Sequence, residues 1–237
     1  MNNPKLTIIL PVINEIKSLN ETIEIIRLEN NKYIKQILFV CDKYKTSKKS
    51  IENCQKYINK EPDIYEMIFQ VSPNVGGAFN DCISHIKCEY TIIMSSDLET
   101  DPYTVKDLIN VSIQNPDSII STSRWHTKKN FKGYGLIKKI LNLIFQKFFS
   151  ILFKTKLTDL TYGYRLYPTS ILKKYKWSMT NHSFFLEIIL RPLIDNFDIK
   201  EVDTMWSKRI EGLSNNKFSF YFSYFVVAFK IYFKRNE

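Results

Sequence analysis

The sequence has few residues of three types, and each shortage narrows what the protein can be. Only 6 glycines in 237 residues argue against a low-complexity or disordered chain. The 4 cysteines form no Cys-x-x-Cys pair and the 3 histidines are widely separated, so no zinc site is expected. Reduced, cytosolic thiols are the default expectation for such cysteines.

Long apolar runs are also missing. No stretch reaches the ~18–20 uninterrupted apolar residues of a transmembrane helix. The apolar run near the N-terminus is too short for a secretory signal. Since 44% of the residues are hydrophobic and 14% aromatic, the chain can still bury one sizeable core. We therefore expect a protein that is soluble or peripheral to a membrane.

The charge is strongly positive, with a formal value of +10 at pH 7. Such a balance suits a polyanionic partner, which could be a nucleic acid, a phosphorylated substrate or an anionic membrane surface. A lysine-rich solvated surface is the simpler alternative. No recognisable nucleic-acid-binding motif is present, so we expect no nucleic-acid partner.

Short apolar runs alternate with helical spacing in the first half of the chain. Strands are expected at residues 6–12, 34–41, 64–71, 90–94 and 118–122, and helices at residues 18–30, 48–59, 78–88 and 101–115. This alternation predicts an α/β fold with a mostly parallel, doubly wound sheet, which binds ligands beyond the carboxyl ends of its strands. Asn14, Asp42 and Asp97 fall at such ends.

Two local signals refine this outline. Ser18 and Glu21 have the spacing of a capping box at the start of the first helix. Residues 74–77 read as a turn. In the second half we expect a polar turn at residues 158–165, a helix at residues 184–193 and a strand at residues 199–205.

Residues 136–153 and 218–233 are rich in apolar and aromatic side chains and also carry lysines. The first of these segments has one narrow polar stripe, made of Lys139, Asn142, Gln146 and Ser150. Amphipathic helices of this kind suit the headgroup layer of an anionic membrane. The alternative is that both helices simply pack on the sheet.

A cluster of carboxylates follows the strand at residues 90–94 and includes Asp97, Glu99 and Asp101. Hard divalent cations prefer oxygen ligands, and Mg²⁺ usually takes one or two carboxylates together with substrate phosphates. The cluster therefore predicts a metal site beside a bound diphosphate, although a helix N-terminal cap would have a similar sequence.

Five segments, in order along nearly the whole chain, resemble motifs of the family 2 glycosyltransferases and, within them, the polyprenyl-phosphate branch that includes dolichol-phosphate mannose synthase. They are residues 7–15 (TIILPVINE), 74–78 (NVGGA), 95–102 (SSDLETDP), 159–165 (DLTYGYR) and 209–217 (RIEGLSNNK). The resemblance implies the GT-A fold and an inverting transfer from a nucleotide-sugar donor. It also implies one domain over residues 1–237, with a nucleotide-sugar half (1–125), an acceptor half (126–217) and an amphipathic C-terminal segment (218–237).

The resemblance also implies roles for individual residues. Asp97, with Glu99 and Ser95, is expected to hold Mg²⁺ or Mn²⁺. Arg165 and Arg209 are expected to clamp phosphate oxygens. Residues expected around the donor are Pro11, Asn14, Glu15, Asp42, Gly77, Ser96, Arg124, Ser214 and Lys217.

The chain departs from the family pattern at several points. Ser95 stands where the family has its first aspartate. The second strand ends in Cys41-Asp42-Lys43-Tyr44, and the turn at Gly76-Gly77 lacks the family's lysine. These differences leave the sugar and the nucleobase of the donor open.

The acceptor is inferred from a missing base. A hydroxyl acceptor needs a general base, whereas a phosphate acceptor does not. Where relatives that use hydroxyl acceptors carry an acidic pair, this chain reads His182-Ser183-Phe184-Phe185. We therefore expect a polyprenyl phosphate acceptor and a protein bound to the cytoplasmic face of a membrane.

Two alternatives stay open. The acceptor could be a saccharide hydroxyl, with Glu187 or Asp159 as the base, or the protein could bind a nucleotide without turnover, as Ser95 would suggest. Structural roles also stay open for Asp159 and Arg165, as an ion pair in a turn, and for Glu187, as a helix residue paired with a basic side chain.

Overall fold

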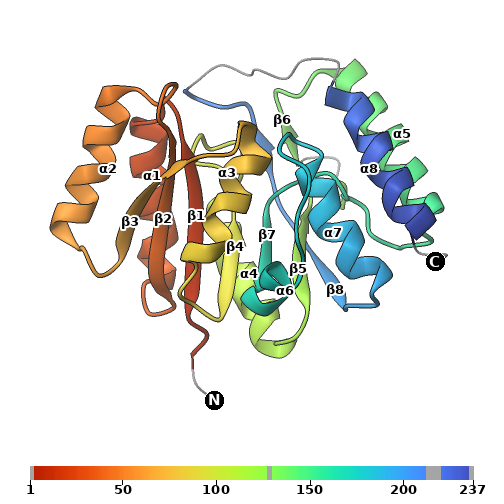
Figure 1. Ribbon diagram of the computed structural model, residues 1–237, viewed down its shortest axis with the longest axis horizontal. Coiled ribbons are helices and arrows are strands. Elements are labelled where there is room, and N and C mark those ends of the chain that lie inside the picture. The colour runs from red at the N-terminus through yellow and green to blue at the C-terminus, as the bar shows by residue number, and fades with distance from the viewer. Residues whose placement is uncertain (1–2, 127–129, 212–219, 235–237) are drawn as a thin grey trace.

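The computed structural model describes residues 3–126, 130–211 and 220–234. Its centre is a seven-stranded sheet (Figure 1), whose strands in spatial order are β3 (Tyr65–Gln70), β2 (Ile34–Asp42), β1 (Leu6–Val12), β4 (Tyr90–Ile93), β7 (Arg165–Pro168), β5 (Ile119–Ser123) and β8 (Ile199–Asp203). Only β7 runs antiparallel to its neighbours in this sheet. The expected α/β fold with a mostly parallel sheet is therefore confirmed.

The five strands expected in the first half all form, each within two residues of its predicted ends. Their β-branched, nearly unbroken apolar runs suit strands that are covered on both faces. In register, Ile9 pairs with Leu38 on one side and with Ile93 on the other. The carboxyl ends of β1, β2 and β4 consequently meet at one edge of the sheet, which is the upper edge in Figure 1.

Helices cover both faces of the sheet. One apolar core includes residues of α1 (Lys17–Asn30), α2 (Lys48–Lys60) and α4 (Thr104–Gln114). The other core includes residues of α3 (Asn74–Cys82), α5 (Leu136–Leu152), α6 (Thr169–Lys174), α7 (Phe184–Ile194) and α8 (Phe220–Lys234). A short 3-10 helix, Ile83–His85, follows α3, and a small parallel ladder joins β6 (Phe131–Lys132) to β9 (Trp206–Ser207).

Two local predictions are wrong. Helix α1 begins at Lys17 with Ile16 at its N-cap and no side-chain cap of its own, so Ser18 and Glu21 form no capping box. Residues 74–77 are the first turn of α3 and not a separate turn, and α3 ends at Cys82. A Cβ on Gly76 would lie 2.6 Å from the Asn181 carbonyl oxygen, so this glycine permits close packing on the segment before α7.

Strand β7 was not predicted. It is only four residues long, begins with an arginine and ends with a proline, which is a weak strand pattern. Its position between β4 and β5 nevertheless completes the sheet. Arg165, expected in a polar turn, is the first residue of this strand.

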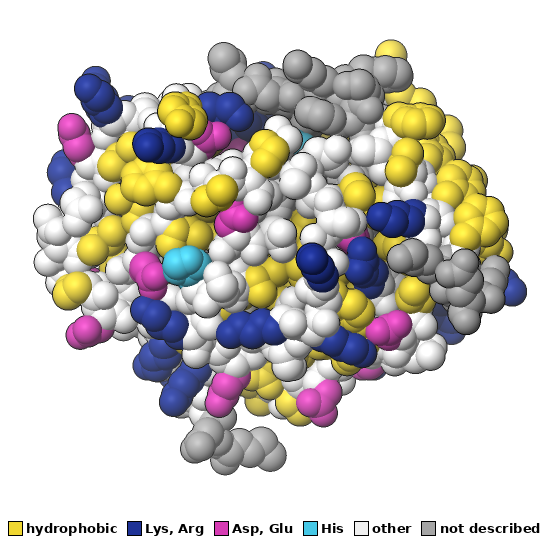
Figure 2. Space-filling model, in the orientation of Figure 1, with side chains coloured by type: hydrophobic (Ala, Val, Ile, Leu, Met, Phe, Trp, Pro, Cys, Tyr) yellow, Lys and Arg dark blue, Asp and Glu magenta, His cyan; other side chains and the backbone are white. Residues whose placement is uncertain are grey.

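Helix α5 is turned with its polar stripe toward the protein. Gln146 is 2% exposed, whereas Ile137 and Ile151 are each 76% exposed. The exposed apolar residues of α5 are Leu136, Ile137, Ile140, Leu141, Leu143, Ile144, Phe148 and Ile151. Figure 2 shows hydrophobic side chains gathered on the right-hand side of the molecule, where α5 and α8 lie.

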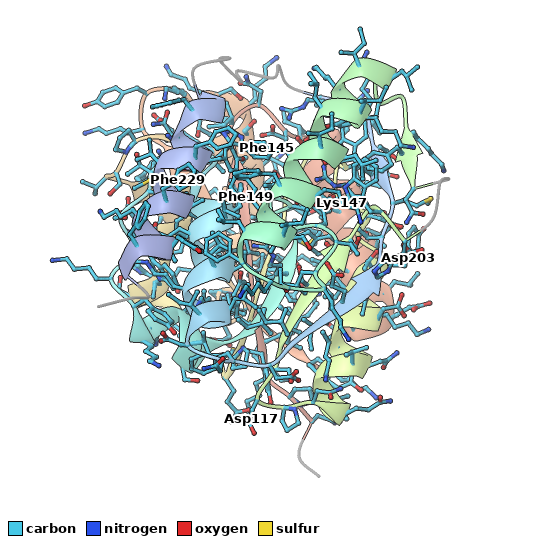
Figure 3. The ribbon with its side chains drawn as sticks, turned by 90° about the vertical axis from the view of Figure 1, so that its right-hand side faces the viewer. Asp117, Phe145, Lys147, Phe149, Asp203 and Phe229 are labelled. Atoms are coloured by element: carbon cyan, nitrogen blue, oxygen red, sulfur yellow. The ribbon has the colours of Figure 1, made fainter. Side chains whose placement is uncertain are left out.

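Helices α5 and α8 lie side by side, with Phe145 and Phe149 of α5 between them (Figure 3). The ring of Phe145 is 5.1 Å from that of Phe225 on α8, in an edge-on arrangement. Outward-facing apolar residues continue on α8, where Phe222, Val226, Phe229 and Phe233 are exposed. Within the described ranges, no helix combines the length and the apolar character needed to cross a bilayer.

Candidate active site at the carboxyl edge of the sheet

The ends of β1, β2 and β4 bring together the polar residues that the sequence placed there. The Ser96 hydroxyl, after β4, donates to the carbonyl oxygen of Pro11 in β1. The Glu15 carboxylate accepts hydrogen bonds from the backbone N–H groups of Ile13, at 2.6 Å, and Asn14, at 2.9 Å. These bonds hold the loop after β1 in one shape and leave the Asn14 residue exposed at the edge.

Asp42, the last residue of β2, closes the next loop. Its carboxylate accepts hydrogen bonds from the N–H groups of Tyr44, at 2.9 Å, and Lys45, at 3.0 Å. Burial raises the pKa of Asp42, but these N–H donors and the Lys45 ammonium outweigh it, so the pKa is lowered. Asp42 is therefore an ionised hydrogen-bond acceptor beside the loop of Asn14 and Glu15.

Asp97 and Glu99 form an acidic pair on the loop after β4. The loop turns at Leu98, whose φ of 62° lies in the left-handed region, which costs a branched side chain energy. This turn lets the Glu99 N–H donate to the Asp97 carboxylate at 3.0 Å. Burial and the charge of Asp97 raise the pKa of Glu99, and Arg209 only partly offsets them.

The donor set of this loop fits a divalent metal. Two carboxylates that repel each other are ligands that Mg²⁺ and Mn²⁺ accept, usually together with substrate phosphates. No group of three or more His, Cys, Asp or Glu residues forms a metal site among the residues described. The Ser95 hydroxyl is within 3.0 Å of the Thr100 hydroxyl and accepts from the Thr100 N–H at 3.3 Å, so Ser95 closes the loop.

Arg209 reaches the acidic pair from a distant part of the chain. Its Nε donates to Glu99 at 2.9 Å, and its Nη2 lies 3.5 Å from an Asp97 carboxylate oxygen. The structure thus places Arg209 beside the two carboxylates, and the expected phosphate contact of Arg209 stays a prediction. His182 lies nearby, where burial and then the charge of Arg209 lower its pKa. Sequence reasoning named His182 only as part of the segment that replaces an acidic pair, because a single histidine in an aromatic segment is usually incidental.

Arg124 and Asp159 form a buried ion pair beside this edge. Arg124 donates to Asp159 through Nε at 2.7 Å and Nη2 at 2.9 Å, and the Asp159 side chain is 0% exposed. Gln146 of α5 donates to the same carboxylate at 3.1 Å. The Arg124 guanidinium also lies 4.2 Å from the ring centroid of Tyr162. Asp159 thus pairs with Arg124, and not with Arg165.

Two more of the expected catalytic residues, besides Asp159, lie in the interior. Arg165 is 0% exposed and its guanidinium donates to the Ser121 hydroxyl and to the carbonyl oxygens of Phe185 and Leu160. The expected phosphate contact of Arg165 is contradicted by this burial. The arginine instead ties β5, β7 and the start of α7 together.

Glu187 is likewise fully buried in α7. Its carboxylate accepts from the N–H groups of Ser178 and Met179 and pairs with Arg191. The structural alternative for Glu187 is therefore the correct one, because no oxygen of this carboxylate faces the carboxyl edge without a partner.

The remaining expectations concern the diphosphate. Gly77 lies in the first turn of α3, where its N–H donates to the Thr180 carbonyl oxygen at 2.9 Å, so that group is already used. Ser214 and Lys217 lie outside the described residues.

Comparisons with known proteins identify the family and a shared fold. Residues 7–176 match the family described as "Glycosyl transferase family 2". Crystal structures of glucosyl-3-phosphoglycerate synthase from Mycobacterium tuberculosis are similar in fold. The complex with Mn²⁺, UDP-glucose and phosphoglyceric acid has a TM-score of 0.73 at 11% identity, covering 98% of this chain and 79% of that one. The complex with Mg²⁺ and UDP has a TM-score of 0.71 at 11% identity, with the same coverage.

Proposed function

This chain belongs to glycosyl transferase family 2, and we propose that it transfers a sugar from a nucleotide-diphosphate sugar to a polyprenyl phosphate at a membrane surface. In this reaction a phosphate oxygen of the lipid attacks the anomeric carbon while the bond to the nucleoside diphosphate breaks. Because the attack comes from the side opposite the leaving group, the configuration inverts.

The donor belongs at the carboxyl edge, with the nucleoside near Asn14, Glu15 and Asp42 and the diphosphate near Asp97 and Glu99. The complexes of the M. tuberculosis enzyme hold UDP together with Mn²⁺ or Mg²⁺, which supports the same ligands here. A divalent cation on the two carboxylates would stabilise the charge of the leaving diphosphate. Arg209 adds a second positive charge at the same place.

The outward apolar face of α5 carries the acceptor assignment. A helix normally turns its apolar side to the core, but α5 exposes eight large apolar residues and buries Gln146. A contiguous exposed apolar surface of this kind marks a binding surface. Lysines on the same helix, including Lys138 and Lys147, suit the anionic headgroups of a bilayer.

Aromatic residues connect this face with the acidic loop. The rings of Phe131, Tyr134 and Trp206 follow one another at centroid distances of 5.2 and 4.7 Å. Tyr134 comes two residues before α5, and Trp206 forms a β-bridge with Thr100 on the acidic loop. An isoprenoid chain lying on α5 would therefore present its phosphate on the side of the acidic loop.

The two candidate bases, Glu187 and Asp159, are already held in ion pairs, which also favours an anionic acceptor. A saccharide hydroxyl would need Glu187 or Asp159 to take its proton, and both carboxylates are buried in ion pairs with arginines. A phosphate acceptor is already deprotonated near neutral pH and needs only cations to position it.

Product analysis tests this proposal directly. The purified chain is incubated with Mn²⁺, a panel of labelled UDP- and GDP-sugars and one of three acceptors: polyprenyl phosphate in anionic vesicles, a free oligosaccharide, or 3-phosphoglycerate. We expect label in the lipid fraction only with polyprenyl phosphate, and none with Asp97→Ala. Transfer to the oligosaccharide or to phosphoglycerate, but not to the lipid, would contradict the acceptor.

A further inference from the structure

The segment from Trp206 to Glu211, here called the strap, crosses the carboxyl edge of the sheet next to the acidic loop. The Ser207 N–H donates to the carbonyl oxygen of Glu99, and the Ile210 N–H to that of Asp97, each at 3.4 Å. The backbone of the strap is thus attached to the same loop that holds the two carboxylates. Between these two attachment points lies Arg209.

Arg209 serves as the counter-ion of both carboxylates in this arrangement. Its Nε lies 2.9 Å from a Glu99 carboxylate oxygen, and its Nη2 lies 3.5 Å from an Asp97 carboxylate oxygen. A divalent cation that binds Glu99 Oε1 and Asp97 Oδ2 would compete with the Arg209 guanidinium for those oxygens. Metal binding there is therefore coupled to the position of Arg209.

The far end of the strap is anchored by Glu211. One oxygen of its carboxylate accepts from the Ile16 N–H at 3.0 Å and from both the N–H and the hydroxyl of Ser18 at 2.9 Å. Helix α1 has no side-chain cap at Ile16 and no acidic residue in its first turn. Glu211 supplies both functions from a position 195 residues further along the chain.

We propose that Glu211 is a positioning residue for metal and donor binding. It anchors the strap to the start of α1 and thereby holds Arg209 against the carboxylates of Asp97 and Glu99. Arg209 keeps this place until metal and donor diphosphate arrive together. Once displaced, the guanidinium stays tethered beside the diphosphate, whose oxygens it can bind bidentately. Metal alone then binds weakly, since it competes with Arg209 for the carboxylate oxygens, whereas metal with diphosphate binds well. This inference rests on the proposed metal-dependent use of a nucleotide sugar.

Mn²⁺ binding, followed by the electron paramagnetic resonance of the free ion, tests the inference without turnover. In the absence of nucleotide we expect Arg209→Gln to bind Mn²⁺ about tenfold more tightly than the unmodified chain, because a charged contact no longer competes. Glu211→Gln should give a smaller gain of about two- to fivefold. With UDP or GDP present we expect the opposite result: Arg209→Gln and Glu211→Gln should both bind Mn²⁺ and nucleotide more weakly than the unmodified chain.

Two further variants separate anchoring from simple helix capping. Ser47→Ala removes the side-chain cap of α2, where Ser47 accepts from the Ser50 N–H, and therefore controls for the loss of a cap elsewhere. Ser18→Ala removes one hydrogen bond to Glu211 at a position where alanine favours the helix, so it loosens the anchor without preventing folding. We expect Ser18→Ala to shift Mn²⁺ binding in the same direction as Glu211→Gln, and Ser47→Ala to leave it unchanged.

The outcomes are distinct. If Glu211→Gln and Ser18→Ala lower the melting temperature as Ser47→Ala does, but bind nucleotide-free Mn²⁺ like the unmodified chain, Glu211 is only a helix cap and the inference is overturned. If the unmodified chain binds no Mn²⁺ even with a nucleoside diphosphate, the proposed function fails and the inference fails with it. If the unmodified chain binds Mn²⁺ with a nucleoside diphosphate, and Arg209→Gln and Glu211→Gln bind Mn²⁺ as tightly as the unmodified chain does, only the inference is overturned.

Discussion

The ion pair of Arg124 and Asp159 allows the sharpest test of structural against catalytic roles. Asp159→Asn keeps the shape of the side chain but leaves the Arg124 guanidinium buried without its counter-ion. Breaking a buried pair in this way costs about 3–5 kcal/mol. Because the amide oxygen can still accept one of the bonds that Asp159 now receives from Arg124 and Gln146, we expect the lower end, about 3 kcal/mol.

This loss should be visible as a change in melting temperature. For a chain of this length 1 kcal/mol corresponds to about 2–4 °C, so Asp159→Asn should melt about 6–12 °C lower in scanning calorimetry. Asp63→Asn, the same change at an exposed site, should melt within about 1 °C of the unmodified chain. The double variant Arg124→Met, Asp159→Leu removes both charges and should be less destabilised than the sum of the single changes.

Kinetics then decide whether Asp159 is a base. If it is structural, the Asp159→Asn protein that remains folded at 15 °C should transfer sugar at a rate within about tenfold of normal, well short of the loss expected for a base. A fall of about 10²–10⁴-fold with an unchanged melting temperature would refute the structural reasoning and return Asp159 to the role of general base.

Three further predictions follow from other parts of the molecule. Asp97→Ala should abolish transfer and metal-dependent donor binding while the circular dichroism spectrum stays normal; normal turnover would remove the metal assignment. The double variant Ile140→Glu, Ile144→Glu places two negative charges on the exposed apolar face of α5, so it should no longer pellet with anionic liposomes in a sedimentation assay. If this variant pellets as well as the unmodified chain, that face is not the membrane contact. The hydrogen bond from Arg27 lowers the pKa of Glu61. The stability that this carboxylate contributes is therefore present above its unfolded pKa and is lost as the pH falls through its folded pKa. Below about pH 5 the urea midpoint of Arg27→Met should consequently fall less steeply with pH than that of the unmodified chain.

Residues at strand ends were accessible to sequence reasoning. The apolar runs of β1, β2 and β4 are local patterns, and a parallel sheet necessarily brings their carboxyl ends to one edge. For this reason Asn14, Asp42 and Asp97 could be placed together from the sequence alone. The family motifs added Glu99 and Arg209, which also lie at this edge.

Charged residues of the second half were harder to assign. Arg165 and Glu187 have the chemistry of a phosphate clamp and a base, yet the fold buries both among backbone carbonyl and N–H groups. A motif gives the residue type and the spacing, but whether a guanidinium points to solvent or to the interior depends on neighbours far along the chain. Glu211 is the opposite case: sequence reasoning gave it no role, but the fold brings it to the start of α1, where its partners Ile16 and Ser18 are 195 and 193 residues away.

Helix α5 shows most clearly what the sequence determined and what only the tertiary structure decided. Its spacing by itself determined that one side is apolar and that a narrow stripe is polar, because that follows from 3.6 residues per turn. Only the tertiary structure decided which side faces inward, because Gln146 finds Asp159, Thr161 and the Leu160 N–H as hydrogen-bond partners beneath the helix. Those three polar groups come from a turn 13–15 residues downstream, and satisfying them in the interior leaves the apolar side of α5 exposed.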